Sequence, residues 1–277
     1  MQIIDHNSYL ADLVASEEAK LWLTPGRSRL LRVLSLTGLA LCVGSVFFVG
    51  VSSTNIIITR VAVGGTVIGG IALFLVCSIA LGVMGLHDRW VAPDLDKHRS
   101  GLEGERMLPK YLASLDDRFY LINWVRLAGM DGDIDHILVG PPGIFVIETK
   151  NHGWYVSCTG DVWDYKRVER DGSVSNGHIR SPSRQVKANA RHLREHLEKT
   201  LGYSQWVEAV VVFTHPKARI EISDATVAVL HGRDVSEYVG SFKAQRVLSD
   251  GMIQKIVTAL KPRRKSLVTR KMLAGMD

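Results

Sequence analysis

The chain contains two long apolar runs without a charged side chain, residues 33–51 and 61–86. Each run is long enough to cross the roughly 30 Å hydrocarbon layer of a membrane as one α-helix. The second run carries several glycines, which are typical of helices that pack closely together in a membrane. The alternative is a pair of buried helices in a soluble domain, where uncharged runs of this length are rare. The sequence therefore predicts a transmembrane hairpin within residues 30–87.

Basic residues beside the two runs predict the orientation of this hairpin. They precede the first run and follow the second, at Lys20, Arg27, Arg29, Arg32, Arg89, Lys97 and Arg99. Between the runs the linker carries only Arg60. By the positive-inside rule we expect an integral protein of the plasma membrane with both termini in the cytoplasm. Residues 1–29 would then be a cytoplasmic segment, and a cytoplasmic domain would span about 95–260.

The C-terminal end, residues 261–277, reads as a basic tail. Seven Lys or Arg residues and no acidic residue lie between Lys255 and Lys271. Such a segment attracts nucleic acid, and it equally attracts the anionic lipid of a nearby membrane. A solvated end without a partner is the third interpretation. A lipid-holding envelope protein would lose membrane association, and nothing else, when residues 262–277 are removed.

The region after the second run has the pattern of a mixed α/β domain. Residues 92–101 read as a linker, and Ser100 with Glu103 predicts the capped start of a helix. Residues 169–178 read as a loop. The remaining elements are predicted as a helix over 100–115, strands over 119–127, 133–150, 154–168, 206–213 and 226–232, and helices over 182–201, 234–242 and 249–261. This order predicts a mixed sheet flanked by helices.

The stretch DIDHILVGPPGIFVIETK, residues 133–150, reads as two strands around a turn, yet it carries acids. With the turn at the two prolines, Asp135 would face Glu148, and Asp133 would face Lys150. Acids opposite each other stand about 5 Å apart and repel. Buried carboxylates need a partner, and a divalent cation with oxygen ligands such as Mg²⁺ is a natural one.

An ordinary salt bridge at a strand end is the alternative to a metal site here. Two further residues favour the site. Glu105 lies on the apolar stripe of Leu108 and Leu112, where packing does not explain it, and Gln185 begins a helix just after the strands. His136 is expected to point to the opposite face and to bond a neighbouring strand instead of a metal.

The runs GLEGE, DGDIDHILVGPPGIFVIETKN and SPSRQVKAN, with Trp163 before the last, resemble the nuclease-related domain, NERD. The resemblance covers about residues 98–215. By its pattern this family is placed in the PD-(D/E)xK nuclease superfamily. The resemblance therefore implies an α/β core in which acids and a lysine surround a divalent metal. Here Ile134, not proline, precedes the strand aspartate.

Carried over to this chain, the resemblance implies that Glu105, Asp135 and Glu148 bind Mg²⁺ or Mn²⁺. Lys150 would be the catalytic lysine, and Gln185 would sit at the site from the following helix. Zinc-protease, P-loop and dinucleotide-binding motifs do not occur in the sequence. The three cysteines are far apart and predict no disulfide framework.

Two functions follow from this sequence. The first is a membrane-anchored, divalent-metal-dependent nuclease that hydrolyses phosphodiester bonds, with DNA favoured as its substrate. The alternative is a catalytically weak or inactive module of the same fold that binds nucleic acid or a protein partner at the membrane. Basic side chains on the helix over 182–201 could contact a phosphate backbone, namely Arg184, Lys187, Arg191 and Arg194. A solvated helix face is the alternative for them.

Overall fold

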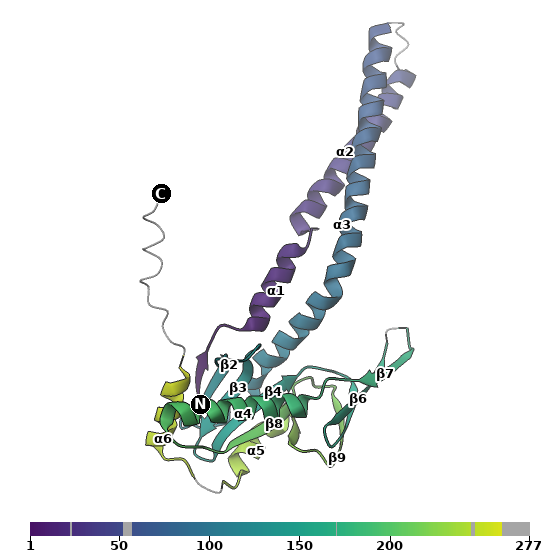
Figure 1. Cartoon of the computed structure of the whole chain (residues 1–277). Helices are drawn as coiled ribbons and strands as arrows, with labels where there is room; N and C mark the ends of the chain where they lie inside the picture. The colour runs from purple at the N-terminus through teal and green to yellow at the C-terminus, as the bar shows by residue number, and fades with distance from the viewer. Residues whose placement is uncertain (23, 52–56, 170, 245–246, 262–277) are drawn as a thin grey trace, which may run out of the picture. The chain divides into compact units, whose positions relative to one another are not determined.

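The computed structural model, shown in Figure 1, describes residues 1–22, 24–51, 57–169, 171–244 and 247–261. The chain divides into two compact units. One consists of Met1–Asp12 together with the residues from Arg99 onward, and the other is Leu13–His98. Of the predicted basic tail, Arg263 to Lys271 lie outside the described residues.

Three helices are found in the first part of the chain, at α1 Tyr9–Lys20, α2 Pro25–Val51 and α3 Ile57–Tyr111. Within the described residues, one helical segment, Gly64–Tyr111, is long and apolar enough to cross a membrane. The predicted first span falls in α2, whose side chains from residue 45 onward are outside the described part.

Helix α3 continues without a break through residues 92–101, which the sequence suggested as a linker. That prediction was wrong because the apolar stripe persists: Leu95 and Leu102, seven positions apart, are both buried. Ser100 therefore lies inside the helix and does not cap it. Its hydroxyl instead donates to the backbone oxygen of Asn151 at 3.4 Å.

A six-stranded mixed sheet forms the centre of the domain, as predicted in outline. Its order is β1 Gln2–Asp5, β2 Tyr120–Val125, β3 Ile134–Gly140, β4 Gly143–Lys150, β8 Val207–Phe213 and β10 Ala228–His231. Strands β2, β3 and β4 are antiparallel, whereas β1, β8 and β10 join in parallel. Val139 pairs with Ile144 and Ile137 with Val146, which confirms the predicted hairpin register.

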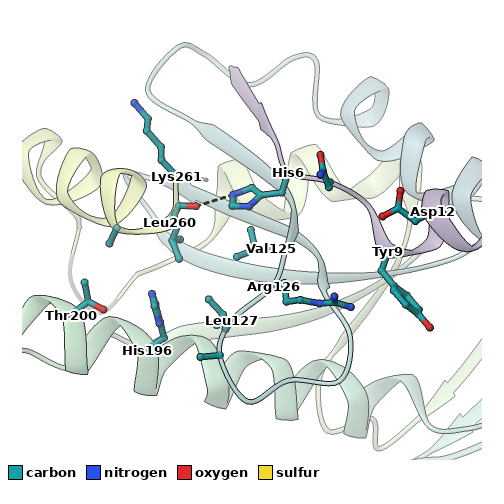
Figure 2. A pocket seen from close by; sticks show the side chains of 13 residues that line it. His6, Tyr9, Asp12, Val125, Arg126, Leu127, His196, Thr200, Leu260 and Lys261 are labelled. Atoms are coloured by element: carbon teal, nitrogen blue, oxygen red, sulfur yellow. Dashed lines mark hydrogen bonds between the residues drawn. The ribbon is translucent and has the colours of Figure 1, made fainter. Parts of the chain in front are cut away.

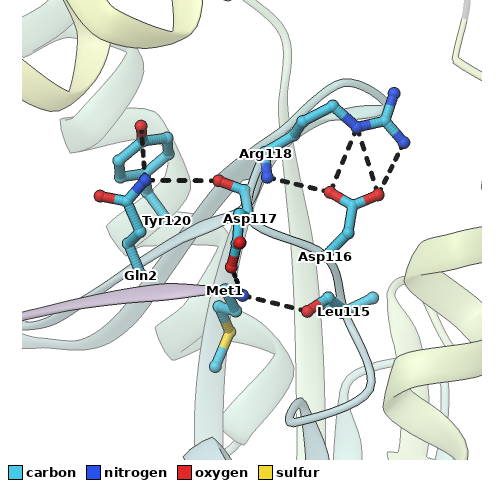
Figure 3. A network of polar contacts seen from close by, with 7 residues as sticks. All are labelled: Met1, Gln2, Leu115, Asp116, Asp117, Arg118 and Tyr120. Atoms are coloured by element: carbon cyan, nitrogen blue, oxygen red, sulfur yellow. Dashed lines mark hydrogen bonds and ion pairs between the residues drawn. The ribbon is translucent and has the colours of Figure 1, made fainter.

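Strand β1 was not predicted, because four residues are too few to show a period. It docks beside the start of β2 through the polar contacts shown in Figure 3. The Met1 amino group donates to the Leu115 carbonyl oxygen and to Asp117 Oδ1, each at 3.1 Å. The Gln2 side chain donates to the Tyr120 hydroxyl at 2.9 Å. The start of the chain is thus part of the sheet that carries the hairpin.

Helices cover both faces of this sheet. On one face α4, Pro182–Leu201, packs against β4 and β8 and against α6, Asp250–Leu260 (Figure 1). Ser181 and Ser249 cap these helices at their N-termini. The apolar face of α4 is buried, at Val186, Ala190, Leu193 and Leu197. A second buried cluster joins the end of α3 to α5, Val235–Ser241, on other apolar sheet residues.

A second, four-stranded sheet was not predicted as a separate layer. Its order is β7 Val174–His178, β6 Val162–Val168, β5 Tyr155–Thr159 and β9 Arg219–Ser223. Residues 169–178 are not a plain loop, since β7 pairs antiparallel with β6. Gly172, with a φ of 83°, supplies the left-handed turn between them. The polar residues of β7 concealed this edge strand.

Candidate functional site

The acidic residues singled out in the sequence lie at the open end of the β3–β4 hairpin. Asp135 is near the start of β3, and Glu148 is near the end of β4. Glu105 is on the last turns of α3, which approach the end of β4 closely. A Cβ on the neighbouring Gly104 would lie 2.5 Å from Asn151 Cβ, so glycine is required for this approach. The amide of Asn151 in turn donates to the Ser100 carbonyl oxygen at 2.9 Å.

Each of the three carboxylates accepts a hydrogen bond from the protein. Lys150 Nζ donates to Glu148 Oε1 at 2.5 Å. Asp135 Oδ2 accepts from the backbone nitrogen of Thr149 at 2.9 Å and from its hydroxyl at 3.2 Å. Glu105 Oε2 accepts from the indole nitrogen of Trp124 at 2.7 Å. The other oxygen of Glu148, Oε2, is buried without a hydrogen-bond partner in the described structure.

The three acids carry more negative charge than their surroundings neutralise. Burial first, and then the charges of Asp133 and Glu148, raise the pKa of Glu105 to about 7 despite the Trp124 bond. Burial, followed by the Glu148 and Glu105 charges, holds the pKa of Asp135 well above its usual value. Burial alone would lower the pKa of Lys150, but the carboxylates outweigh it and the net pKa is raised. One lysine thus faces several acids.

This donor set fits a divalent cation in its chemistry. Its oxygen ligands are the type that Mg²⁺ and Mn²⁺ prefer, and the unpartnered Glu148 Oε2 offers a free acceptor. In their present arrangement, however, the described residues include no group of three His, Cys, Asp or Glu side chains that could hold a metal ion. The carboxylates are turned toward Lys150, Trp124 and Thr149. Binding of a cation would require Lys150 to turn away from Glu148.

Asp133 and Gln185 are the two other residues that the sequence predicted near the acids. Asp133 accepts from the backbone nitrogen of Tyr9 at 2.9 Å, so it helps to dock the start of the chain. Gln185 is half-buried in the first turns of α4. The hydrogen bonds of the described residues include none from its side chain to the acids, and its predicted place at the site stays a prediction.

Sequence reasoning missed Trp124, whose indole contacts Glu105. It has a φ of 58°, a left-handed conformation that is rare for a residue of this size. Its neighbours pair regularly, Asn123 with His136 and Val125 with Ile134, so Trp124 stands opposite Asp135. A tryptophan inside a strand pattern reads as ordinary packing, and no sequence signal marks such a backbone angle.

His136 behaves as predicted for a core histidine. It is fully buried, and its Nδ1 is 2.7 Å from Asn123 Oδ1 on the neighbouring strand. The Asn123 amide donates onward to Asp5 Oδ1 at 2.7 Å. Burial lowers the pKa of His136 to about 3, which keeps the ring neutral. The chain Asp5–Asn123–His136 ties β1, β2 and β3 together beside the acids.

A pocket that does not contain the acids opens beside β1 and β2, at the same end of the sheet as the acids. It measures about 820 Å³ and is drawn in Figure 2. Its lining includes Arg126, Lys261, His6 and Tyr9. The Arg126 guanidinium lies 5.2 Å from the centre of the Tyr9 ring, and His6 Nε2 lies 2.9 Å from the Leu260 carbonyl oxygen. A basic, partly aromatic hollow therefore adjoins the loop that leads to Asp133.

Among the basic residues predicted to contact phosphates on α4, Lys187 is already engaged, since its ammonium bonds both oxygens of Asp161 at 2.7 and 3.0 Å. Arg184, Arg191 and Arg194 are exposed. Two tryptophans of the domain differ in their burial. Trp163 is fully buried and donates to Ser183, whereas Trp206 is 72% exposed.

Comparison with known proteins gives three findings. Residues 100–214 match the family model of the nuclease-related domain. An uncharacterized protein of Bacillus anthracis is 27% identical over 159 residues, which cover 54% of this chain and 70% of that protein. No solved structure matches the chain significantly. The matched segment begins at Ser100 and ends at Thr214, and so contains all four residues of the acid and lysine cluster.

Proposed function

Because residues 100–214 match the family model of the nuclease-related domain, we propose that this chain hydrolyses phosphodiester bonds of nucleic acid with the help of a divalent cation. DNA is the favoured substrate, and Mg²⁺ or Mn²⁺ the favoured cation. The observation that carries the proposal is the gathering of Glu105, Asp135 and Glu148 with Lys150 at one sheet end, where burial and then the neighbouring negative charges raise the pKa of Glu105 and of Asp135. An excess of buried carboxylates with one lysine is an arrangement that costs stability and suits a cation.

In the proposed reaction Glu105, Asp135 and Glu148 would hold the cation. The bound cation would supply Lewis-acid polarisation of the scissile phosphodiester. Asp135 is held in place by two bonds from Thr149, so its carboxylate is already oriented. Lys150 keeps its positive charge beside the acids, and it would orient the attacking water or stabilise charge that develops on the phosphate.

We further propose that α2 and α3 anchor this domain as a transmembrane hairpin with the domain in the cytoplasm. Backbone contact between the helices supports this: a Cβ on Gly38 would lie 2.8 Å from the Gly70 carbonyl oxygen. The Ser35 and Ser78 hydroxyls are 3.4 Å apart across the same pair. Cysteines placed at Ser53 and Ser28 in a chain without native cysteines test it. A membrane-impermeant maleimide should label position 53 in intact cells and position 28 only after lysis.

A second function, a binding module without turnover, is favoured by one specific observation. Lys150 already occupies one oxygen of Glu148, and such a lysine–glutamate pair would be expected in a site that had lost its metal. Such a module would bind nucleic acid in a salt-dependent way and leave it intact.

The experiment that separates the two functions uses the full chain in detergent. It is incubated with supercoiled plasmid, linear duplex, single-stranded DNA and RNA, in Mg²⁺, Mn²⁺ or EDTA. Metal-dependent cutting that is absent from Asp135→Ala supports the nuclease. Salt-dependent binding with no cutting of any substrate supports the module, and neither cutting nor binding would overturn both proposals.

A further inference from the structure

We propose that Trp124 is a positioning residue that aims Glu105 at the cation, an inference that rests on the proposed function. The indole nitrogen of Trp124 donates to Glu105 Oε2 at 2.7 Å. Indole is a donor only, so it can hold one oxygen of this carboxylate and leave the other free for a ligand. Carboxylates that bind metals are commonly oriented by a hydrogen bond of this kind.

The backbone of Trp124 is bent in a way that the neighbouring residues enforce. Ile122 and Val125 belong to the same buried cluster although they are three positions apart. In a regular strand such residues would lie on opposite faces, so the left-handed turn at Trp124 reverses the alternation. Ile134 and Ile137 on the opposing strand share that cluster as well. Regular alternation along β3 would place Ile134 on the face of Leu138, but Leu138 belongs to the other buried cluster.

The bend is held in place from both sides. On one side, the bond that the Asn123 amide donates to Asp5 and the bond between Asn123 and His136 hold β1, β2 and β3 together just before it. On the other side, Val125 pairs with Ile134 and is buried. Rare backbone angles persist only where the surroundings determine them, and they cluster at functional sites. Here the bend coincides with the residue whose indole bonds Glu105.

Trp206 offers a matched control. Its indole nitrogen also donates to a glutamate, Glu208 Oε2, at 3.0 Å. It precedes β8 next to Val207, which pairs with Ile144 at the turn end of β4, whereas Glu148 pairs with Val211. A tryptophan–glutamate bond away from the acids should have no influence on a cation there.

The test measures Mn²⁺ binding to the full chain by electron paramagnetic resonance, with no nucleic acid present. Trp124→Phe keeps the ring and removes the donor, and it should weaken Mn²⁺ binding about 10–100-fold, whereas Trp206→Phe should not. If the unaltered chain binds Mn²⁺ and Trp124→Phe binds it equally well, the inference is overturned. If the unaltered chain binds no Mn²⁺, the proposed metal site itself fails.

A second measurement needs no change at Trp124, in case that variant does not fold. The chain is labelled with 5-fluorotryptophan, and its fluorine resonances are assigned by substituting the other five tryptophans one at a time. Saturating Mn²⁺ should broaden the Trp124 resonance strongly and leave that of Trp206 sharp. A Trp124 resonance that stays as sharp as that of Trp206 while Mn²⁺ is bound would contradict the inference.

Discussion

The two ends of the β3–β4 hairpin are built from the same two strands and follow opposite rules. At the turn end, Val139 and Ile144 pair across the ladder and are almost fully buried among apolar neighbours. At the open end, Asp135, Glu148 and Lys150 crowd charges together. Local preference, packing and pairing agree at the first end and conflict at the second. Such conflicts are expected at functional sites, where a less stable arrangement of side chains is kept for its function.

The largest effect is expected from Lys150→Ala. Cleavage should fall by about 10²–10³-fold, because the charge beside the reacting phosphate is lost. The chain without metal should also lose about 3–5 kcal/mol of unfolding free energy, since Glu148 would keep a buried, unpaired carboxylate. Cleavage rates and thermal melts in EDTA measure the two losses.

The matched change at the turn end is Ile144→Val, which removes one buried methyl group. It should cost about 0.5–1.5 kcal/mol of unfolding free energy and leave cleavage unchanged. Equal losses of cleavage in Ile144→Val and Lys150→Ala would show that the open end has no special role.

The next largest effect on stability is expected from the polar lock beside the open end, which is the hydrogen-bonded chain Asp5–Asn123–His136. Asn123→Ala removes the link between buried His136 and Asp5, and should destabilise the chain by about 1–3 kcal/mol. The exposed Asn176 on β7 is the control, and Asn176→Ala should stay within about 0.5 kcal/mol. Denaturant unfolding of the two variants measures the difference. A similar small loss in both would mean that this lock does not hold the strands.

The pH dependence of stability should reveal the crowded acids. Glu105 keeps its proton in the folded chain up to about pH 7, whereas the unfolded chain releases it near pH 4.5. The folded state thus binds more protons in this window, so the unfolding free energy falls as pH rises, by at most about 1.4 kcal/mol per pH unit for one proton.

Glu105→Gln should make the fall of the unfolding free energy with pH shallower. It should not abolish the fall, because the raised pKa of Asp135 contributes in the same direction. Thermal melts in EDTA from pH 4.5 to 8 check it, with Ile144→Val as the control that keeps the full slope. An unchanged slope in Glu105→Gln would contradict the assignment of the raised pKa to this residue.

The smallest effect is expected at the pocket lined by Arg126, which lies at the same end of the sheet as the acids. Arg126→Ala should remove about one phosphate contact, which lowers the salt dependence of nucleic-acid binding by about one unit of the log–log slope. Arg118, at the other end of β2 and bonded to Asp116, is the control. Binding isotherms at several salt concentrations compare them. Identical slopes for both variants would show that the pocket does not receive the nucleic acid.

Much of this domain could be predicted from the sequence, because its signals are local. The alternating apolar residues and the Pro-Pro turn set the hairpin register, and this register brings Asp135 to the end where Glu148 and Lys150 lie. The helix predicted over 182–201 is α4, because its Ser181 cap and its apolar stripe are local signals as well.

The rest depended on contacts between residues far apart in the chain. Strand β1 exists because β2, more than a hundred residues later, pairs with it. Proline and glycine residues within α3 suggested a break in this helix. It continues without one because buried leucines pack along its length. The angle at Trp124 follows from the strands on either side, so its bond to Glu105 could not be anticipated.

Anomalous scattering from Mn²⁺-soaked crystals of the full chain tests the proposed metal site most directly. A manganese peak is expected within ligand distance of the carboxylates of Glu105, Asp135 and Glu148, with Lys150 turned away from Glu148. The same soak with Glu148→Ala should lose the peak. A manganese peak elsewhere, or no peak in a chain that still cleaves nucleic acid with Mn²⁺, would contradict the claim that this end of the sheet is the metal site.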